Sequence, residues 1–239
     1  MWGLSLYTAL IQTRTSSKRL KSKVLLKILN LEIFLIVYKR TLKSELIDRA
    51  IIVTSQSKSD DIIEHICKKR KIPIFRGSLN NVLKRYYDCS KKNSLNDVVR
   101  ITSDCPFIDP KIITKLCNKY RKKKVKYASN IINPTFPDGF DVEIFSFDLL
   151  KTTLTNSKSK KSKEHVTFDM IKNNSIKKYN LRNKVNLSKY RLTLDTFEDY
   201  LKIKTIFNKF KSIYKPDLKS VSKIILNNKK KYFQVRPTY

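Results

Sequence analysis

Six short apolar runs, rich in β-branched and aromatic residues, alternate along the chain with longer segments whose apolar residues recur at helical spacing. This alternation is typical of strand–helix–strand units, which build a mostly parallel sheet with helices on its faces. The sequence therefore predicts an α/β fold. The expected strands cover residues 6–12, 49–55, 72–75, 97–102, 125–129 and 141–146.

The segments between the expected strands carry helix-start signals. Ser59 or Asp60 can cap one helix, and Asp109 can cap another because a proline follows at the first turn. The pattern of residues 197–210 predicts a further helix, and the tail after it is a weaker helical segment. Residues 155–165 are polar, and they predict a mobile loop that ends where another helix begins.

The chain is strongly basic, because 52 Lys and Arg against 20 Asp and Glu give its 239 residues a formal net charge of +32. Such a charge favours a phosphate-rich partner such as a nucleic acid, or an anionic surface. The lysines are accompanied by abundant Asn and Ile and by only three glycines, a drift that AT-rich codons also produce. Charge alone therefore leaves both explanations open.

Length and a hydrophobic content of 41% suffice for one core. The four cysteines are widely spaced without a CxxC pair, so neither a zinc site nor a disulfide framework is indicated. The first residues lack the basic start of a signal peptide, and the apolar run at residues 31–38 is too short to span a bilayer. We expect a soluble cytoplasmic protein without a membrane partner.

A cationic loop follows the first expected strand. Its six basic side chains belong to Arg14, Lys18, Arg19, Lys21, Lys23 and Lys27. Open α/β sheets bind ligands at the carboxyl ends of their strands, so cations placed there can meet phosphate groups. The loop contains neither GxxxxGK[ST] nor GxGxxG, and it must hold phosphate in a different way.

The loop belongs to the segment IQTRTSSKRLKSKVLL at residues 11–26, and seven further characteristic segments follow in order. They are LIDRAIIVTS (46–55), DDIIEHICKKRKIPIFRGS (60–78), VLKRYYD (82–88), VVRITSDCPFIDP (98–110), PDGFDVEIFSFDLL (137–150), KEHVTFDMI (163–171) and YRLTLDTFEDY (190–200). Over residues 8–210 the chain resembles the sugar-activating cytidylyltransferases, in particular the spore-coat polysaccharide biosynthesis or acylneuraminate cytidylyltransferase-like branch. That branch begins approximately IQARMxSxRLPGKVL, and CMP-KDO synthetases are its more distant relatives.

The resemblance implies the nucleotide-diphosphosugar transferase fold, a GT-A-like, Rossmann-like arrangement with a mostly parallel central sheet flanked by helices. It implies transfer of CMP from CTP to an acidic sugar with release of pyrophosphate, for surface polysaccharide or glycoconjugate biosynthesis. Mg²⁺ is the implied cofactor and a homodimer the implied assembly. Residues 1–210 would form the nucleotidyltransferase domain and residues 211–239 a C-terminal helical tail of the same domain. The sugar, and whether the base must be cytosine, stay open.

The matched motifs also imply the nucleotide-binding residues. These are Gln12, Arg14, Arg19, Lys23, Arg85, Ser103 and Asp104. Transfer at an already anionic phosphate depends on positioning and on charge neutralisation. Within this set, Arg14, Lys23 and Asp104 are therefore the expected catalytic residues.

Asp104 follows the expected strand at 97–102 and so lies at its carboxyl end. Mg²⁺ prefers carboxylate and phosphate oxygens, and the resemblance pairs Asp104 with Asp195 as the metal ligands. Each aspartate has an alternative role as a helix cap, although Asp109 is the better cap for the helix after Asp104.

In the acceptor region the resemblance implies Asp141, Glu143 and His165 as sugar-binding residues. The cations Lys163 and Arg191 are candidates for binding a sugar carboxylate. His165 can take the proton of the attacking hydroxyl or serve as a structural hydrogen-bonding group, and the sequence leaves both roles open.

The cationic loop departs from the family pattern, because Lys21 and Ser22 replace the Pro and Gly of LPGK. If the Gly position needs a positive φ, Ser22 costs roughly 1 to 2 kcal/mol. Thr13 replaces an Ala near the expected base. One rival hypothesis is therefore a catalytically drifted homologue. Another is a basic nucleic-acid-binding protein on the same scaffold, although the sequence has no recognised nucleic-acid-binding motif.

Overall fold

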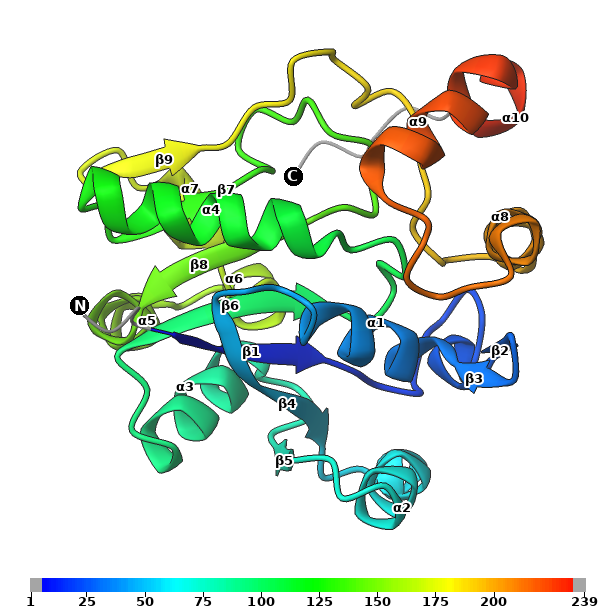
Figure 1. Ribbon diagram of the computed structural model, residues 1–239. Helices are drawn as coiled ribbons and strands as arrows, with labels where there is room; N and C mark the ends of the chain where they lie inside the picture. Colours follow the sequence, from blue (N-terminus) through cyan, green and yellow to red (C-terminus); the bar gives the residue numbers. More distant parts are fainter. Residues whose placement is uncertain (1–5, 234–239) are drawn as a thin grey trace.

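In the computed structural model, which describes residues 6–233, a seven-stranded sheet forms the centre of the molecule (Figure 1). The strands lie in the order β5-β4-β1-β6-β8-β7-β9. Their bounds are β1 Tyr7–Gln12, β4 Ile47–Ser55, β5 Ile74–Gly77, β6 Asp97–Thr102, β7 Tyr127–Ser129, β8 Glu143–Ser146 and β9 Lys178–Asn180. A separate two-stranded hairpin consists of β2 Lys27–Ile28 and β3 Leu31–Glu32.

The sheet is mostly parallel, as the sequence predicts. The central strand β1 pairs in parallel with β4 and β6, and β4 pairs in parallel with β5. β8 runs antiparallel to β6 and β7, so in Figure 1 its arrow points against those of β1 and β6. The carboxyl ends of β1 and β6 therefore lie at the same edge of the sheet as the amino end of β8.

Helices cover both faces of the sheet. Their bounds are α1 Ile33–Thr41, α2 Asp61–Lys69, α3 Val82–Lys92, α4 Pro110–Lys123, α5 Phe147–Asn156, α6 Lys160–Glu164, α7 Phe168–Lys172, α8 Phe197–Phe210, α9 Leu218–Asn227 and α10 Lys229–Tyr232, with 3₁₀ turns η1 Lys23–Leu25 and η2 Lys58–Asp60. Within residues 6–233, no helix combines the length and the apolar character that a membrane crossing requires.

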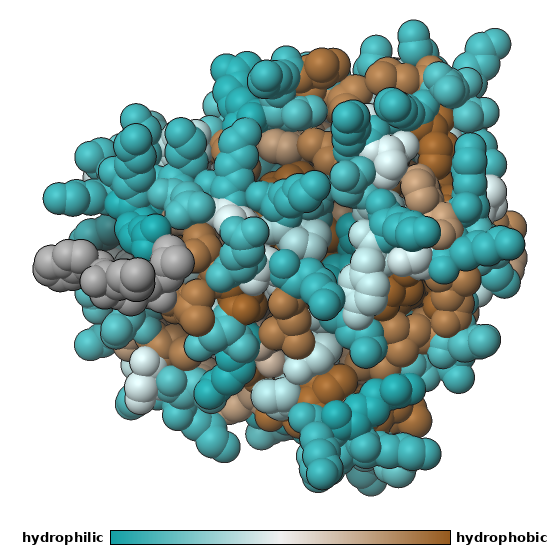
Figure 2. All heavy atoms as spheres, in the orientation of Figure 1, coloured by the Kyte–Doolittle hydropathy of each residue, from teal (hydrophilic) through white to brown (hydrophobic). Residues whose placement is uncertain are grey.

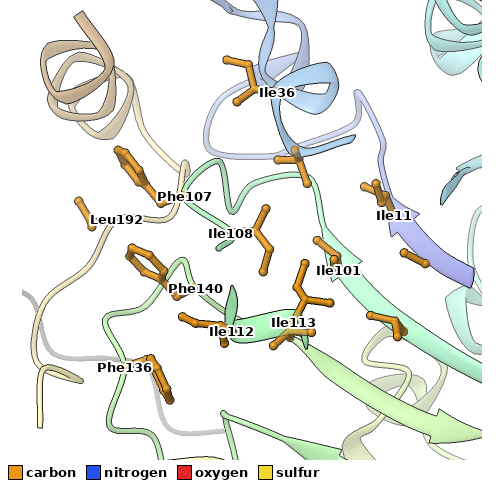
Figure 3. Packing of buried hydrophobic residues seen from close by; sticks show 14 of the residues in the cluster. Ile11, Ile36, Ile101, Phe107, Ile108, Ile112, Ile113, Phe136, Phe140 and Leu192 are labelled. Carbon is orange, nitrogen blue, oxygen red and sulfur yellow. The ribbon is translucent and has the colours of Figure 1, made fainter. Parts of the chain in front are cut away.

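The alternation of side chains along β1 builds two apolar layers. Ile11 belongs to a cluster that includes α1, α4, α8 and α9, whereas Leu10 belongs to a second cluster with α3, α5 and α7. Figure 3 shows part of the first cluster, where Ile113 of α4 lies beside Ile101 of β6 and Ile36 of α1 belongs to the same cluster. The sheet is therefore buried on both sides, and its strand ends are left to form a site.

Capping confirms one expected helix start and corrects others. The Asp109 carboxylate accepts the backbone N–H of Lys111 at 2.8 Å, as predicted. Thr196 caps α8 in a capping box with Asp199, so Asp195 is not the cap. Asp60 precedes α2 but makes no capping hydrogen bond to it, because its side chain is turned into the protein.

The prediction of a mobile loop at residues 155–165 is wrong. α5 extends to Asn156, and Ser159 caps α6 by accepting the backbone N–H of Ser162 at 3.0 Å. The hydroxyl of Ser162 also donates to Asp169 of α7 at 2.8 Å. Serine hydroxyls therefore give this polar segment a helical start and a fixed position beside α7.

Candidate nucleotide-binding site

A cavity of about 620 Å³ opens at the edge where β1 and β6 end and β8 begins. Its volume is in the range of small-molecule sites. The nucleotide-binding, metal-binding and sugar-binding residues that the sequence motifs imply line this cavity, except Arg85; of the two candidates for binding a sugar carboxylate, Arg191 lines it and Lys163 does not. The lining members are Gln12, Arg14, Arg19, Lys23, Ser103, Asp104, Asp141, Glu143, His165 and Asp195.

The cationic loop after β1 is closed by hydrogen bonds to one carbonyl. The Thr15 carbonyl accepts the backbone N–H groups of Ser17 at 2.8 Å and Ser22 at 2.9 Å. Ser22 has φ +54°, which lies in the left-handed region. Glycine adopts this region without strain, whereas a residue with a side chain is strained there. This turn precedes η1, whose first residue, Lys23, lines the cavity.

Lys23 joins the two acidic residues expected to hold metal. Its Nζ lies 3.0 Å from Oδ2 of Asp104 and 2.9 Å from Oδ1 of Asp195, and it donates to the Leu194 carbonyl at 2.6 Å. The guanidinium of Arg19 lies 2.7 Å from the same Asp195 oxygen. Two carboxylates and two cations from three separate parts of the chain therefore meet in the cavity.

The charges in this cluster keep one another ionised. Burial acts to lower the pKa of Lys23, but the carboxylates of Asp104 and Asp195 raise that pKa above its ordinary value. Burial acts to raise the pKa of Asp104, but the Lys23 ammonium holds it below its ordinary value. At neutral pH Lys23 is therefore protonated and Asp104 is ionised.

Arg191 holds Asp195 from the other side. Its guanidinium donates to Oδ2 of Asp195 and to the Thr193 hydroxyl, the latter at 2.6 Å. It also lies 3.7 Å from the Asp138 carboxylate. The Asp195 backbone N–H in turn donates to Asp199 at 3.0 Å. The position of Asp195 is therefore set by both side-chain and backbone contacts.

Gly139 allows the segment before β8 to approach the chain around Arg191. Gly139 has φ +109°, and a Cβ there would lie 2.8 Å from the carbonyl carbon of Leu192. Beside it, the Asp138 carbonyl accepts the Leu192 N–H at 2.7 Å. The motif PDGFD therefore brings Asp138 and Asp141 into the cavity lining.

A buried ion pair links the three strands at this edge. Arg100 of β6 pairs with Glu143, which lies opposite it on β8. The Arg100 guanidinium also donates to the Gln12 side chain at 3.1 Å, and Tyr127 donates its hydroxyl to Glu143 at 2.7 Å. Arg100 was not among the residues expected from the sequence, although a charged residue inside an apolar strand was the signal for it.

The segment from α6 to α7 supplies another wall of the cavity. There Glu164 lies 3.6 Å from the guanidinium of Arg14, which belongs to the cationic loop. Burial lowers the pKa of His165 below its ordinary value, more than nearby Glu164 raises it. His165 is therefore neutral at pH 7. Lys172 of α7 also lines the cavity, although it was not among the residues expected from the sequence.

Arg85 and Thr13, which were both expected near the nucleotide, lie outside the cavity lining. Arg85 is fully buried and does not line the cavity; its guanidinium donates to the carbonyls of Ser78 at 2.8 Å and Leu79 at 3.3 Å. It therefore supports the connection between β5 and α3. Thr13 is also buried outside the cavity lining, with its hydroxyl directed to the Ile11 carbonyl at 3.3 Å. The change from Ala at this position does not reach the cavity surface.

The fold and the site together define a nucleotidyltransferase, in which a cationic loop and paired carboxylates meet at the carboxyl ends of parallel strands. A family model described as cytidylyltransferase matches residues 8–234. The chain belongs to the cytidylyltransferase family, and this membership supports nucleotidyl transfer that uses CTP.

Individual relatives agree with this assignment. The uncharacterized protein MJ1063 of Methanocaldococcus jannaschii is 38% identical over 196 residues, which cover 80% of this chain and 79% of the relative. The spore coat polysaccharide biosynthesis protein SpsF of Bacillus subtilis is 29% identical over 229 residues, which cover 92% of this chain and 93% of the relative. The structure of a cytidylyltransferase from Leptospira borgpetersenii superposes with a TM-score of 0.89 at 29% identity, covering 98% of this chain and 100% of that one. The expected family and fold are thereby confirmed.

Proposed function

We propose that this protein transfers CMP from CTP to an acidic sugar, with release of pyrophosphate, during synthesis of a surface polysaccharide or glycoconjugate. The observation that carries the proposal is the contact of Lys23 with both Asp104 and Asp195 inside the cavity. The similarity to a relative named for spore coat polysaccharide biosynthesis supports the polysaccharide context.

The cationic loop is the binding site that we assign to the CTP triphosphate. Arg14, Arg19 and Lys23 all line the cavity, and the Arg19 side chain is 60% exposed and accessible to an incoming ligand. Each guanidinium can form paired hydrogen bonds to phosphate oxygens, whereas the ammonium acts as a point charge. Gln12 and Ser103 border the same space and are assigned to the nucleotide.

Asp104 and Asp195 are the residues that would hold Mg²⁺. Their carboxylates converge closely enough for one cation to touch both, because the Lys23 ammonium does so at 3.0 and 2.9 Å. Among residues 6–233 no group of three or more acidic, His or Cys side chains is placed to hold a metal. The pair Asp104 and Asp195 fits Mg²⁺, which takes one or two protein carboxylates together with phosphate oxygens and waters. Bound there, Mg²⁺ would supply positive charge to the phosphate oxygens.

The reaction forms one bond and breaks another at the α-phosphorus. A hydroxyl oxygen of the sugar attacks this phosphorus, and the bond to the bridging oxygen breaks as pyrophosphate leaves. Arg14, Arg19 and Lys23 stabilise the negative charge on the leaving group. Neutral His165 lies in the cavity lining and accepts the proton of the attacking hydroxyl in this proposal.

Lys172 is the cation that we assign to the carboxylate of the sugar. The two cations suggested by the sequence are less suited to it, because Arg191 already contacts Asp195 and Asp138, and Lys163 does not line the cavity. Lys172 lines the cavity at the end of α7, with its ammonium 4.3 Å from the centre of the Phe168 ring.

Thermal-shift measurements with each of the four nucleoside triphosphates, with and without Mg²⁺, test the proposal. A short nucleic acid serves as a parallel ligand. We expect stabilisation selective for CTP that requires Mg²⁺, since a ligand that binds only the folded state raises its stability. Stabilisation by the nucleic acid alone, with steep salt dependence, would instead favour the nucleic-acid-binding hypothesis. Failure of every triphosphate to bind would favour a drifted homologue.

Pyrophosphate release in the presence of acidic sugars then tests the acceptor. With a sugar that supports turnover, Lys172→Met should raise the KM for that sugar about tenfold and leave the KM for CTP unchanged, because one charged contact contributes about 1.4 kcal/mol or more. Lys163→Met is the matched control from the neighbouring helix. Equal effects of the two substitutions would remove Lys172 from the acceptor site.

A further inference from the structure

The carboxylate of Asp60 lies beneath the cationic loop, outside the cavity. The residue is completely buried, at the end of η2 and directly before α2. Its Oδ1 accepts the backbone N–H of Thr15 at 2.8 Å and the Thr15 hydroxyl at 2.7 Å. Its Oδ2 accepts the Thr54 hydroxyl at 3.0 Å, the Ser55 N–H at 3.2 Å and the Ser55 hydroxyl. One side chain therefore joins the cationic loop to the carboxyl end of β4.

These five hydrogen bonds account for a charge in the interior. Burial of a carboxylate is costly unless donors surround it, and burial acts to raise the pKa of Asp60. The hydrogen bonds from Ser55, Thr15 and Thr54 outweigh that effect and hold the pKa below its ordinary value. An ionised carboxylate only accepts hydrogen bonds, so it fixes the direction of every donor around it.

Thr15 is the residue through which this anchor reaches the site. The Thr15 carbonyl accepts the N–H groups of Ser17 and Ser22, which lie on the two sides of the loop. Ser22 is followed directly by Lys23, whose ammonium contacts Asp104 and Asp195. A continuous series of hydrogen bonds and one peptide link therefore runs from Asp60 to Lys23, whose ammonium lines the cavity.

A capping role does not account for Asp60. Its side chain makes no capping hydrogen bond to α2, and the preceding 3₁₀ turn is capped by Ser57, which accepts the Ser59 N–H. The donors that the Asp60 carboxylate meets belong to the loop after β1 and to the end of β4.

We propose that Asp60 is a positioning residue for the triphosphate, which anchors Thr15 and thereby sets the placement of the loop that carries Arg14, Arg19 and Lys23. The proposal rests on the assignment of this loop to the CTP triphosphate. Asp60 does not line the cavity, so it acts through the loop and not on the substrate.

The first test needs no ligand. In Asp60→Asn one carboxylate oxygen becomes an amide that cannot accept hydrogen bonds, so either the Thr15 side or the β4 side loses its partner. We expect amide hydrogen exchange of the peptide containing Ser17 and Ser22 to become at least tenfold faster. Asp97→Asn is the matched control, because Asp97 is a half-buried carboxylate at the amino end of β6 that accepts the Tyr120 hydroxyl. Unchanged exchange in the loop of Asp60→Asn, and likewise of Asp60→Ala, which leaves neither side a partner, would overturn the proposal.

The second test uses CTP with Mg²⁺ and calorimetric titration. Asp60→Asn should raise the Kd for CTP at least tenfold, whereas Asp97→Asn should lower the melting temperature without changing that Kd. Combination with Lys23→Ala separates positioning from general destabilisation. If Asp60 places Lys23, the loss from Lys23→Ala should be at least threefold smaller in the Asp60→Asn background than in the natural protein. Strictly additive losses would refute the link between the two residues.

Thr15→Val provides a milder variant in case Asp60→Asn folds poorly. It removes the hydroxyl, whose one proton is within reach of both the Asp60 carboxylate at 2.7 Å and the Ser59 carbonyl at 2.9 Å, and it keeps the backbone N–H bond. We therefore expect the same changes with smaller size. The proposed function and the proposed role of Asp60 can each be contradicted independently of the other. If the natural protein does not bind CTP, the assignment of the function is wrong, and the hydrogen-exchange comparison still decides whether Asp60 anchors the loop.

Discussion

Lys23 shows how much of the site depends on single contacts between distant residues. Its ammonium balances two carboxylates, Asp104 and Asp195, that would otherwise repel each other across the cavity. The sequence motifs identified all three residues, with Lys23 assigned to the triphosphate and the two aspartates assigned to the metal. The contacts among them could not be predicted, because they join residues 81 and 172 positions apart.

Removal of the Lys23 ammonium should expose the carboxylate pair to metal. In Lys23→Met the two carboxylates lose their shared cation, so their mutual repulsion should favour a divalent ion in its place. We expect the Kd for Mn²⁺ in the absence of nucleotide to fall about tenfold, or about 1.4 kcal/mol, measured by electron paramagnetic resonance of free Mn²⁺. Lys27→Met is the control, since Lys27 is exposed and lies near Glu32. A Kd for Mn²⁺ that is equal in both variants would contradict a metal position at Asp104 and Asp195.

Ser22 stores strain that can be released by one substitution. Its φ of +54° costs a residue with a side chain roughly 1 to 2 kcal/mol more than it costs glycine. Part of this difference is offset in Ser22→Gly, because glycine has the greater backbone entropy in the unfolded chain. Ser22→Gly should therefore raise the free energy of unfolding by about 0.5 to 1 kcal/mol in urea titrations. Ser16→Gly, in the same loop but without a positive φ, should be neutral or destabilising. Stabilisation by both changes, or by neither, would show that the left-handed turn is not strained.

At the scale of elements, the sequence predicts the strands better than the connections. The run DVVRIT predicts β6 with its observed bounds, and the other five expected strands are present with ends that differ by at most two residues. β2, β3 and β9 have only two or three residues each, too few to show an apolar pattern. The antiparallel direction of β8 was also not predicted, because side-chain alternation is the same for either direction.

The same limits apply to the site. The resemblance located the residues on loops, since their motifs are contiguous in sequence. It could not reveal the support from Asp60, because Asp60 acts through Thr15 on the loop after β1 and through Thr54 and Ser55 on β4. It also did not predict that Arg191 contacts Asp195, four residues further along the chain. Arg85 was expected to bind the nucleotide because its position in the motif matched. The residue is instead buried beside Gly77, and its guanidinium donates to the carbonyls of residues 78 and 79.

Arg40 joins the C-terminal segment to the rest of the protein. It is buried on α1 and donates to four carbonyls, those of Phe107 and Ile108 in the loop after β6 and those of Ile213 and Pro216 before α9. Burial lowers the pKa of Arg40 to about 10, so the guanidinium stays charged at neutral pH. We therefore expect residues 211–233 to fold together with the nucleotidyltransferase domain.

Replacement of Arg40 tests this connection. Arg40→Met leaves four buried carbonyls without their donor, and we expect the free energy of unfolding to fall by about 3 kcal/mol or more. Limited proteolysis should then cut first between residues 211 and 217. Arg121→Met, which removes an exposed guanidinium at the end of α4, should change stability by less than about 0.5 kcal/mol. A small loss in Arg40→Met, without faster cleavage, would show that the C-terminal segment does not depend on this residue.

On the scale of the whole molecule, the net charge of +32 has two separate consequences. Figure 2 shows hydrophilic side chains spread over the visible face, with apolar residues between them, so hydrophilic residues are not confined to one patch there. Only a few of the cations converge on the cavity, where carboxylates balance them. The remaining lysines repel one another, which destabilises the compact state.

Salt should therefore act in opposite directions on folding and on ligand binding. Raising NaCl from about 20 to about 300 mM screens the surface lysines, and we expect the melting temperature to rise by about 2 to 4 °C, the shift that about 1 kcal/mol produces in a chain of this size. The affinity for CTP with Mg²⁺ should fall over the same range, since its contacts are charged.

A variant with fewer surface charges separates these effects. Lys122, Lys123, Lys219 and Lys223 are exposed and have no ion pair within the described part of the chain. Changing all four to Gln should raise the melting temperature at low salt and reduce its response to NaCl, whereas changing all four to Arg keeps the charge and should do neither. The Kd for CTP should be the same in both variants, because these residues do not line the cavity. If the Gln variant instead lost binding of a nucleic acid and CTP failed to bind the natural protein, the surface charge and not the cavity would be the functional feature of this chain.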